Sequence, residues 1–259
     1  IGRWQYMINC YKPLSFILAT RIYYIGESIN LFLPAKAGDL SKAVYLNRMR
    51  GVSLVYGASS VLFEKLLDLL AICFIFLFGW FYNGMADFEY MPSLFSFIFL
   101  VIAIFILFLF VDKFLFIKIY INRFNSIKIS DAFKDFQLFV GHIKKDNFRL
   151  LLFILISILF WLGHCLQIHL FFRAVNINIT YIDTIMIMPI TFIISLLPFT
   201  IAGFGTREAT LMLLLSSYAP NENIIAGCIL LSLRYLIPAL IGLFFGKICS
   251  LKKLKNDQF

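Results

Sequence analysis

Residues 92–111 (PSLFSFIFLVIAIFILFLFV) form a run of 20 residues without a charged side chain. At about 1.5 Å per residue, a helix of this length crosses a hydrocarbon core of about 30 Å. The whole chain is 61% hydrophobic and has a mean hydropathy of +0.90. In lipid, only helices and closed barrels satisfy every backbone hydrogen bond. We therefore expect an all-α, polytopic membrane protein that forms a single transmembrane domain over residues 1–259.

The distribution of charge predicts the topology. The formal net charge is +9, but the basic residues cluster beside the apolar segments, which indicates anionic headgroups and not nucleic acid. Residues 113–149 carry eight Lys or Arg against three Asp, which predicts a cytoplasmic segment. The links at 83–91 and 174–183 contain no basic residue and are expected outside. The basic residues of 247–255 then place the C-terminus in the cytoplasm.

Two segments are expected near the inner membrane surface. Residues 1–13 are basic and aromatic, which predicts that Trp4 and Tyr6 lie at headgroup depth. Within 113–149, apolar residues recur at the spacing of an amphipathic helix with Ser130 as its N-cap: Phe133, Phe136, Phe139, Val140 and Ile143. This helix either lies on the membrane surface or packs against the helical bundle.

Residues 196–209 (LLPFTIAGFGTREA) interrupt an apolar stretch. Proline removes a backbone donor and glycine adopts conformations that other residues avoid, so a helix is expected to break here. The break contains Pro198, Gly203 and Gly205, followed by a capping Thr206 and the charged pair Arg207 and Glu208. The arm that follows has about 12 residues, which is too short to cross the membrane.

A second interruption begins at Pro34 and restarts as a helix near Gly38 and Asp39. It also leaves an arm of about 12 residues, which predicts a hairpin that enters and leaves by the cytoplasmic face. The stretches LFLPAKAGDLSKA and LLPFTIAGFGTREA resemble each other, and the topology makes them enter from opposite sides. Two broken or re-entrant hairpins of this kind indicate an inverted repeat, a design found in transporters. We expect Gly38 and Thr206 to approach each other near the membrane midplane.

Helices that start inside the membrane present free N–H groups and the positive end of their dipole. Lys42 and Arg207 lie close to these starts in the sequence and add full positive charge. The combination favours an anion such as a lipid phosphate.

Charged residues in apolar helices need partners, because each costs at least about 2.5 to 3.5 kcal/mol at depth. One group lies in the first half of the helix predicted over 54–82: Glu64, Lys65 and Asp68. These residues form either a structural ion-pair cluster or one wall of a headgroup cavity. Arg234 lies midway along the last span, where Glu208, Asp68, Glu64 or a bound phosphate would neutralise it. Arg207 and Glu208 are expected to serve different partners.

The sequence carries little sign of catalysis. It contains no Ser-His-Asp arrangement, HExxH, P-loop or GxGxxG strand motif, so no catalytic residue is assigned. His164 and His169 lie five residues apart without an evident third ligand, so we expect interhelical hydrogen bonds and not a metal site. We expect no cofactor.

Four stretches together resemble the lysylphosphatidylglycerol synthase transmembrane region, a flippase-like (UPF0104-type) family of bacterial and archaeal membrane proteins: NLFLPAKAGDLSKAVYL, VLFEKLLDLLAI, LLPFTIAGFGTREATLMLLL and SLRYLIPALIG. The resemblance extends from about residue 28 to 246. Its most specific element is Gly-x-Gly-x-Arg-Glu, which ends at Glu208. Where the family usually has arginine after glutamate, this chain has Lys65, which keeps the charge without the planar fork.

The resemblance implies a pair of spans before Ile1, a location in the cell membrane, and movement of lipids with charged or glycosylated headgroups between leaflets. The soluble aminoacyl-transferase domain of larger members is absent from the 259 residues, so lysyl transfer is not predicted. Residues and resemblance together predict an anionic-lipid site made of Pro34, Gly38, Asp39, Lys42, Glu64, Lys65, Asp68, Pro198, Gly203, Gly205, Thr206, Arg207, Glu208 and Arg234.

We expect the chain to bind and translocate a phosphate-bearing lipid, such as aminoacyl-phosphatidylglycerol or a polyprenyl-phosphate sugar. Two alternatives remain. One is a membrane-embedded glycosyl or acyl transferase that uses the same lipid pocket. The other is a non-transporting partner that recruits a biosynthetic enzyme through 113–149. The sequence leaves the oligomeric state, the direction of transport and the energy coupling open.

Overall fold

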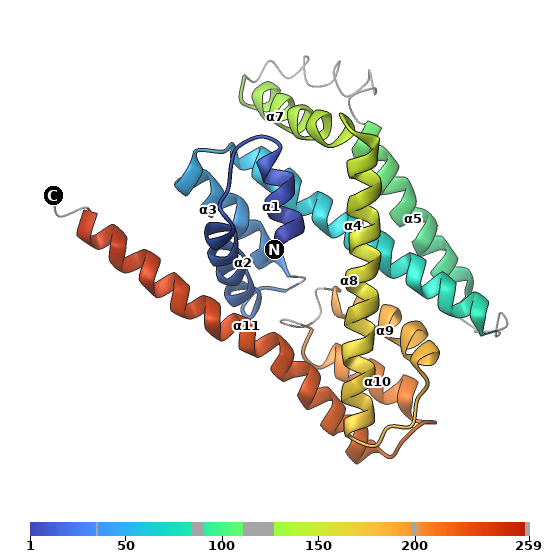
Figure 1. Ribbon diagram of the computed structural model, residues 1–259. Helices are drawn as coiled ribbons and strands as arrows, with labels where there is room; N and C mark the ends of the chain where they lie inside the picture. The colour runs from blue at the N-terminus through green and yellow to red at the C-terminus, as the bar shows by residue number, and fades with distance from the viewer. Residues whose placement is uncertain (35, 84–90, 111–126, 198–199, 201–202, 257–259) are drawn as a thin grey trace.

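The computed structural model describes residues 1–34, 36–83, 91–110, 127–197, 200 and 203–256. Within them every regular element is a helix, which confirms the all-α class. In chain order the helices are α1 (Gly2–Asn9), α2 (Phe16–Asn30), η1 (Ala37–Leu40, a 3-10 turn), α3 (Ser41–Arg50), α4 (Leu54–Tyr82), α5 (Met91–Phe110), α7 (Ile127–Lys144), α8 (Asn147–Ala174), α9 (Tyr181–Ser195), α10 (Thr206–Leu215) and α11 (Asn221–Asn256) (Figure 1).

Two helices in the described part of the chain are long and apolar enough to cross a membrane, over Asn147–Ala174 and Asn221–Gly246. Two shorter apolar helices accompany them, Phe95–Phe110 and Tyr181–Ser195. Helix α4 has 29 residues but carries three charged side chains in its first half. Because charge at depth must be paired, the structure has to supply partners for α4 from neighbouring helices.

The hydrophobic core has two main parts that share α4 and α8. One part gathers residues of α1, α3, α5 and α7 around Phe63 of α4 and Phe153 of α8. The other gathers residues of α9, α10 and α11 around Ile72 and Ile75 of α4 and Ile168 of α8. Figure 1 shows α8 crossing α4 near the centre of the molecule, with α11 running along the lower left of the view. Helices α4 and α8 therefore connect the two parts of the core.

Helices α2 and α11 approach so closely that no side chain fits between them at one point. A Cβ atom added to Gly242 would lie 1.8 Å from the carbonyl oxygen of Tyr24 and 2.1 Å from the Ser28 hydroxyl. Beside this contact, the Ser28 hydroxyl donates a hydrogen bond of 2.7 Å to the carbonyl oxygen of Ala239. Glycine lets backbones come together in this way, and small polar side chains then join the helices.

Helix α7 packs against the bundle. Three of the five residues on its expected apolar face are buried, and they join the core formed by α1, α4, α5 and α8: Phe139, Val140 and Ile143. This supports the packed interpretation of the amphipathic helix. The expected N-cap is wrong, because the helix already begins at Ile127 and Ser130 lies inside it. The described residues include α7 but not 113–126 of the same segment.

The start of α8 offers a local test of helix stability. Asp146 is its N-cap, and the carboxylate accepts hydrogen bonds from the backbone N–H groups of Phe148 (3.0 Å) and Arg149 (3.4 Å). Asp146→Ala should lower the free energy of unfolding by about 1 kcal/mol, because two N–H groups lose their acceptor. Thermal unfolding of the purified protein in detergent measures this loss. Asp146→Asn keeps the cap and should retain most of the stability; an equal loss in both variants would contradict the capping role.

Candidate functional site

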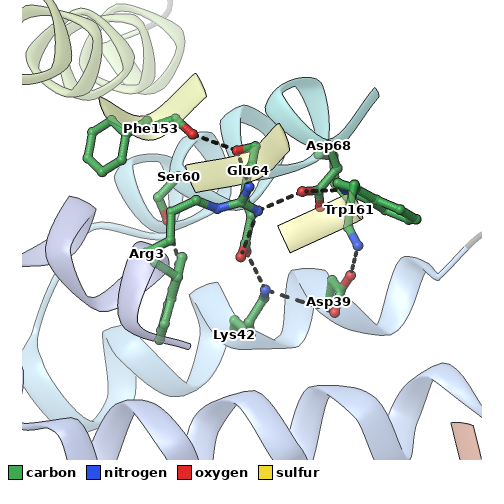
Figure 2. A network of polar contacts seen from close by, with 11 residues as sticks. Arg3, Asp39, Lys42, Ser60, Glu64, Asp68, Phe153 and Trp161 are labelled. Atoms are coloured by element: carbon green, nitrogen blue, oxygen red, sulfur yellow. Dashed lines mark hydrogen bonds and ion pairs between the residues drawn. The ribbon is translucent and has the colours of Figure 1, made fainter. Parts of the chain in front are cut away.

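Six charged side chains form a connected network beside the first half of α4, which we call the α4 ion-pair network: Arg3, Asp39, Lys42, Glu64, Lys65 and Asp68 (Figure 2). Glu64 lies at its centre, where its carboxylate accepts a 2.7 Å hydrogen bond from Lys42 Nζ. Lys42 is 1% exposed and Glu64 is 7% exposed. The charged residues predicted on α4 therefore do have partners, and these come from η1, α3 and α1.

Arg3 was not among the residues predicted for the site. Its guanidinium donates to Asp68 at 2.8 Å and to Glu64 at 3.3 Å, and it also bonds the Ser157 hydroxyl on α8. The ring of its neighbour Trp4 is fully buried within the protein, and its N–H donates to Ser60 at 3.1 Å. The basic, aromatic composition of α1 suggested a segment at the membrane surface. In the structure α1 packs against α4, because Arg3 pairs with Glu64 and Asp68.

The first chain break places Asp39 in the network. Asp39 is 4% exposed, pairs with Lys65, and accepts a 3.1 Å hydrogen bond from the Asn30 side-chain amide. The turn is tight because Gly38 lies directly against the end of α2: an added Cβ would be 2.5 Å from the backbone nitrogen of Asn30. Gly38 therefore acts by allowing this approach. Pro34, at the start of the break, is exposed.

A cavity of about 510 Å³ lies beside the network. Six residues predicted for the site line it: Asp39, Lys42, Glu64, Lys65, Asp68 and Arg234. The structure adds others from α1, α2, the first chain break, α8 and α11: Arg3, Tyr23, Tyr24, Glu27, Lys36, Phe160, Trp161, His164 and Tyr235. Trp161 also donates a 3.2 Å hydrogen bond to Asp68, which ties the aromatic wall to the ion pairs. The cavity thus combines charged groups from both ends of the sequence with aromatic rings.

Three cations lie near the ring of Tyr235 on α11. Lys36 Nζ lies 4.9 Å from the ring centre, the Arg207 guanidinium carbon 5.0 Å, and that of Arg234 5.4 Å. Lys36 belongs to the first chain break and Arg207 to the second, so the two breaks reach the same side chain. Cations are stabilised over an aromatic face, more strongly when they are removed from water.

Arg234 has a different partner from those expected. Its guanidinium contacts the imidazole of His164 on α8, and none of Glu64, Asp68 and Glu208 forms an ion pair with it. The expectation of interhelical contacts for the histidines is confirmed, since His169 also bonds Thr184 of α9 at 3.2 Å. Within the described residues, neither Arg234 nor Lys36 forms an ion pair with a carboxylate.

Arg207 and Glu208 at the second break bind each other, so the expectation of separate partners is wrong. Arg207 Nε donates to Glu208 at 3.1 Å and its Nη2 also bonds Ser232 of α11 at 2.7 Å. The other Glu208 oxygen accepts 2.6 Å from the backbone nitrogen of Gly205. Gly205, not Thr206, is therefore the N-cap of α10, and Glu208 supplies the capping oxygen.

The glycines of this break have the conformation that only glycine adopts readily. Gly203 has φ of 75° and Gly205 has φ of 93°. Thr206 supports the turn through its hydroxyl, which lies 3.0 Å from that of Thr200. Gly205 and Glu208 line a second cavity of about 480 Å³ between α10 and α11 whose other walls are mostly apolar. Pro198 lies outside the described residues.

These contacts divide the predicted residues by chemistry. In the α4 ion-pair network and in the Arg207–Glu208 pair, every cation already forms an ion pair with a carboxylate. These cations are therefore not free to bind a ligand. Lys36 and Arg234 are positive groups of the cavity wall that contact rings and, among the described residues, form no ion pair with a carboxylate. A phosphate would find donors at this point, and arginine can hold it with two parallel hydrogen bonds. Lys36 and Tyr235 lie in the stretches LPAKAGD and SLRYLIP, which were singled out in the sequence. No sequence pattern predicted that the two side chains would contact each other.

The comparison with known proteins finds two archaeal membrane proteins of similar sequence. The chain is 24% identical over 261 residues to the UPF0104 membrane protein MJ1595 of Methanocaldococcus jannaschii, a match that covers 93% of this chain and 77% of that protein. It is also 24% identical to the UPF0104 membrane protein MJ1078 of the same organism, covering 89% of this chain and 99% of that protein. No solved structure matches the chain.

Residues 1–242 match the family described as the lysylphosphatidylglycerol synthase TM region, a span that includes both chain breaks, the α4 ion-pair network and Tyr235. The match covers most of the 259 residues and agrees with the apolar helices of the fold. The chain is therefore a membrane protein that belongs to the lysylphosphatidylglycerol synthase transmembrane-region family.

Proposed function

We propose that this protein binds a phosphate-bearing lipid in the 510 Å³ cavity and moves it between leaflets. The observation that carries the proposal is the pair Lys36 and Arg234. These two cations of the cavity wall contact aromatic or imidazole rings, and within the described part of the chain neither forms an ion pair with a carboxylate. An uncompensated positive charge inside a membrane protein is costly, and a bound phosphate would neutralise it.

The closed ion pairs have a supporting role in this proposal. Lys42 and Arg3 are held by Glu64, and Lys65 is held by Asp39, so these cations shape the wall without being free to follow a ligand. Arg207 is held by Glu208 and also lies 5.0 Å from the centre of the Tyr235 ring. The phosphate contacts are therefore assigned to Lys36 and Arg234. The sequence had favoured Lys42 and Arg207, with Arg234 as a further candidate.

We further propose that the two chain breaks are the ends of re-entrant hairpins related as an inverted repeat in a multi-pass protein with a cytoplasmic C-terminus. The shared contact of Lys36 and Arg207 with Tyr235 supports this arrangement, because a central site between two breaks is what such a repeat produces. Small movements of either break would then change the surroundings of the same ring.

Transport is tested in liposomes that contain phosphatidylglycerol with a fluorescent acyl chain, where dithionite bleaches only the outer leaflet. The protein should expose inner-leaflet lipid to bleaching, whereas protein-free liposomes should not. Arg234→Gln should reduce the rate about tenfold, because one charge-assisted phosphate contact is lost. Arg234→Lys should retain part of it, and Arg173→Gln, an exposed arginine on α8, is the matched control.

Two results would contradict the proposal. One is bleaching that is the same with and without protein for every phosphate-bearing lipid tried. The other is an equal rate for Arg234→Gln and the wild-type chain. Formation of a new lipid product from labelled lipid and a sugar or acyl donor would instead support the transferase.

A further inference from the structure

The charged side chains of the cavity wall do not cancel. Five are cationic and four are carboxylates: Arg3, Lys36, Lys42, Lys65 and Arg234 against Glu27, Asp39, Glu64 and Asp68. The difference, five minus four, leaves one positive charge. The neighbouring Arg207 does not alter this balance, because Glu208 neutralises it outside the cavity lining.

The excess charge is localised. Three cations, Arg3, Lys42 and Lys65, pair with three of the carboxylates in the α4 ion-pair network. The remaining groups are Lys36 and Arg234 at Tyr235, and Glu27 on α2, which interacts with the hydroxyl of Tyr23. Two cations therefore face one carboxylate at the part of the cavity between α2 and α11.

The wall also offers acceptors for uncharged donors. Asp68 keeps 20% of its side chain exposed beside Trp161, and Glu27 is half-buried next to Tyr23. Carboxylate oxygens bind hydroxyl groups through strong hydrogen bonds without any change in the charge of the ligand. The rings of Tyr24, Phe160 and Trp161 add apolar surface to the cavity wall.

Charge balance then decides between headgroups. A ligand of net charge −1 brings the cavity to neutrality, whereas a zwitterionic ligand leaves one positive charge and a cationic headgroup leaves two. Unbalanced charge is costly away from water, so the first kind is favoured. We infer that the preferred ligand is a lipid phosphodiester of net charge −1 whose headgroup beyond the phosphate is uncharged and carries hydroxyl groups, as in a glycerol or sugar phosphodiester. This inference rests on the proposed function and selects among its substrates against aminoacylated lipids.

The inference is tested by lipid binding to the purified, delipidated protein, measured by native mass spectrometry. The probes are phosphatidylglycerol, phosphatidylinositol, phosphatidylethanolamine and lysylphosphatidylglycerol at equal concentration. The first two should bind about tenfold more tightly than the last two. Equal binding of all four, or a preference for lysylphosphatidylglycerol, would overturn the inference while leaving phosphate binding intact. Failure to bind any of them would instead count against the proposed function itself.

Two variants test the charge balance directly. Lys36→Gln reduces the cavity charge from +1 to zero and should remove the preference for phosphatidylglycerol over phosphatidylethanolamine. Glu27→Gln raises the charge to +2 and should shift the preference towards the dianionic cardiolipin. Circular dichroism and gel filtration check that both variants remain folded. If both fold and keep the wild-type order of lipids, charge balance does not select the ligand and the inference is wrong.

Discussion

Gly242→Ala should destabilise the protein by about 3 kcal/mol or more, although alanine is the better helix former. The new Cβ would overlap the carbonyl oxygen of Tyr24 at 1.8 Å, so α2 and α11 would have to separate. Their separation would also break the hydrogen bond from Ser28 to Ala239. Because α2 contributes Glu27 to the cavity and α11 contributes Arg234, lipid binding should fall together with stability. Thermal unfolding in detergent measures the first effect, and native mass spectrometry with phosphatidylglycerol measures the second.

Gly246→Ala is the matched control, because it makes the same substitution one turn further along α11. An added Cβ there meets no atom within 4 Å, so the higher helix propensity of alanine should leave the stability unchanged or slightly raised. Equal melting temperatures for the two variants would show that the close approach of α2 and α11 does not hold the bundle together.

Glu64→Gln should cost about 3 kcal/mol of unfolding free energy, although it preserves the shape of the side chain. Lys42 is 1% exposed, and its other carboxylate neighbour, Asp39, is 4.0 Å away and already engaged with Lys65. Removal of the charge of Glu64 leaves a buried ammonium group without its 2.7 Å partner. Chemical or thermal unfolding of the detergent-solubilised protein measures the loss.

Two further variants separate this cause from a general loss of packing. Asp131→Asn removes a carboxylate from an exposed ion pair with Lys134 and should change stability by less than about 1 kcal/mol. The double variant Glu64→Gln with Lys42→Met removes both buried charges and should recover part of the stability of Glu64→Gln alone. If the double variant is the less stable one, the unpaired lysine is not what destabilises the single variant.

The helices could largely be predicted because their signals are local. The long helix predicted over 54–82 is α4, and the break that begins at Pro34 restarts at η1 and α3 as expected. Apolar runs, a proline and glycines act on the residues beside them, so the chain order alone reveals them. The need for partners around Glu64 was equally visible, since charge in an apolar helix requires compensation whatever the fold.

The identity of those partners could not be predicted in the same way. Arg3 meets Asp68 across 65 positions of the chain, and Arg234 meets His164 across 70. Such pairs depend on the rotation of each helix about its axis and on the point where it crosses its neighbours. The periodicity of a single segment predicts neither quantity. The partner of Arg207 could not be predicted either, although it is the next residue. Neighbours on a helix point apart, but the Glu208 side chain turns back to accept a hydrogen bond from the Gly205 nitrogen, and this brings its other oxygen to Arg207.

The sequence by itself determined that this chain is helical, enters a membrane, breaks twice and carries buried charge, because composition and local backbone chemistry suffice for each. Only the tertiary structure decided that the two breaks contact one ring, Tyr235. It also decided that, among the described residues, Lys36 and Arg234 form no ion pair while the neighbouring cations are paired. The reason is that pairing is settled by the packing of α2, α4, α8 and α11 together. The close contact at Gly242 brings α2 against α11 and so sets one wall of the cavity.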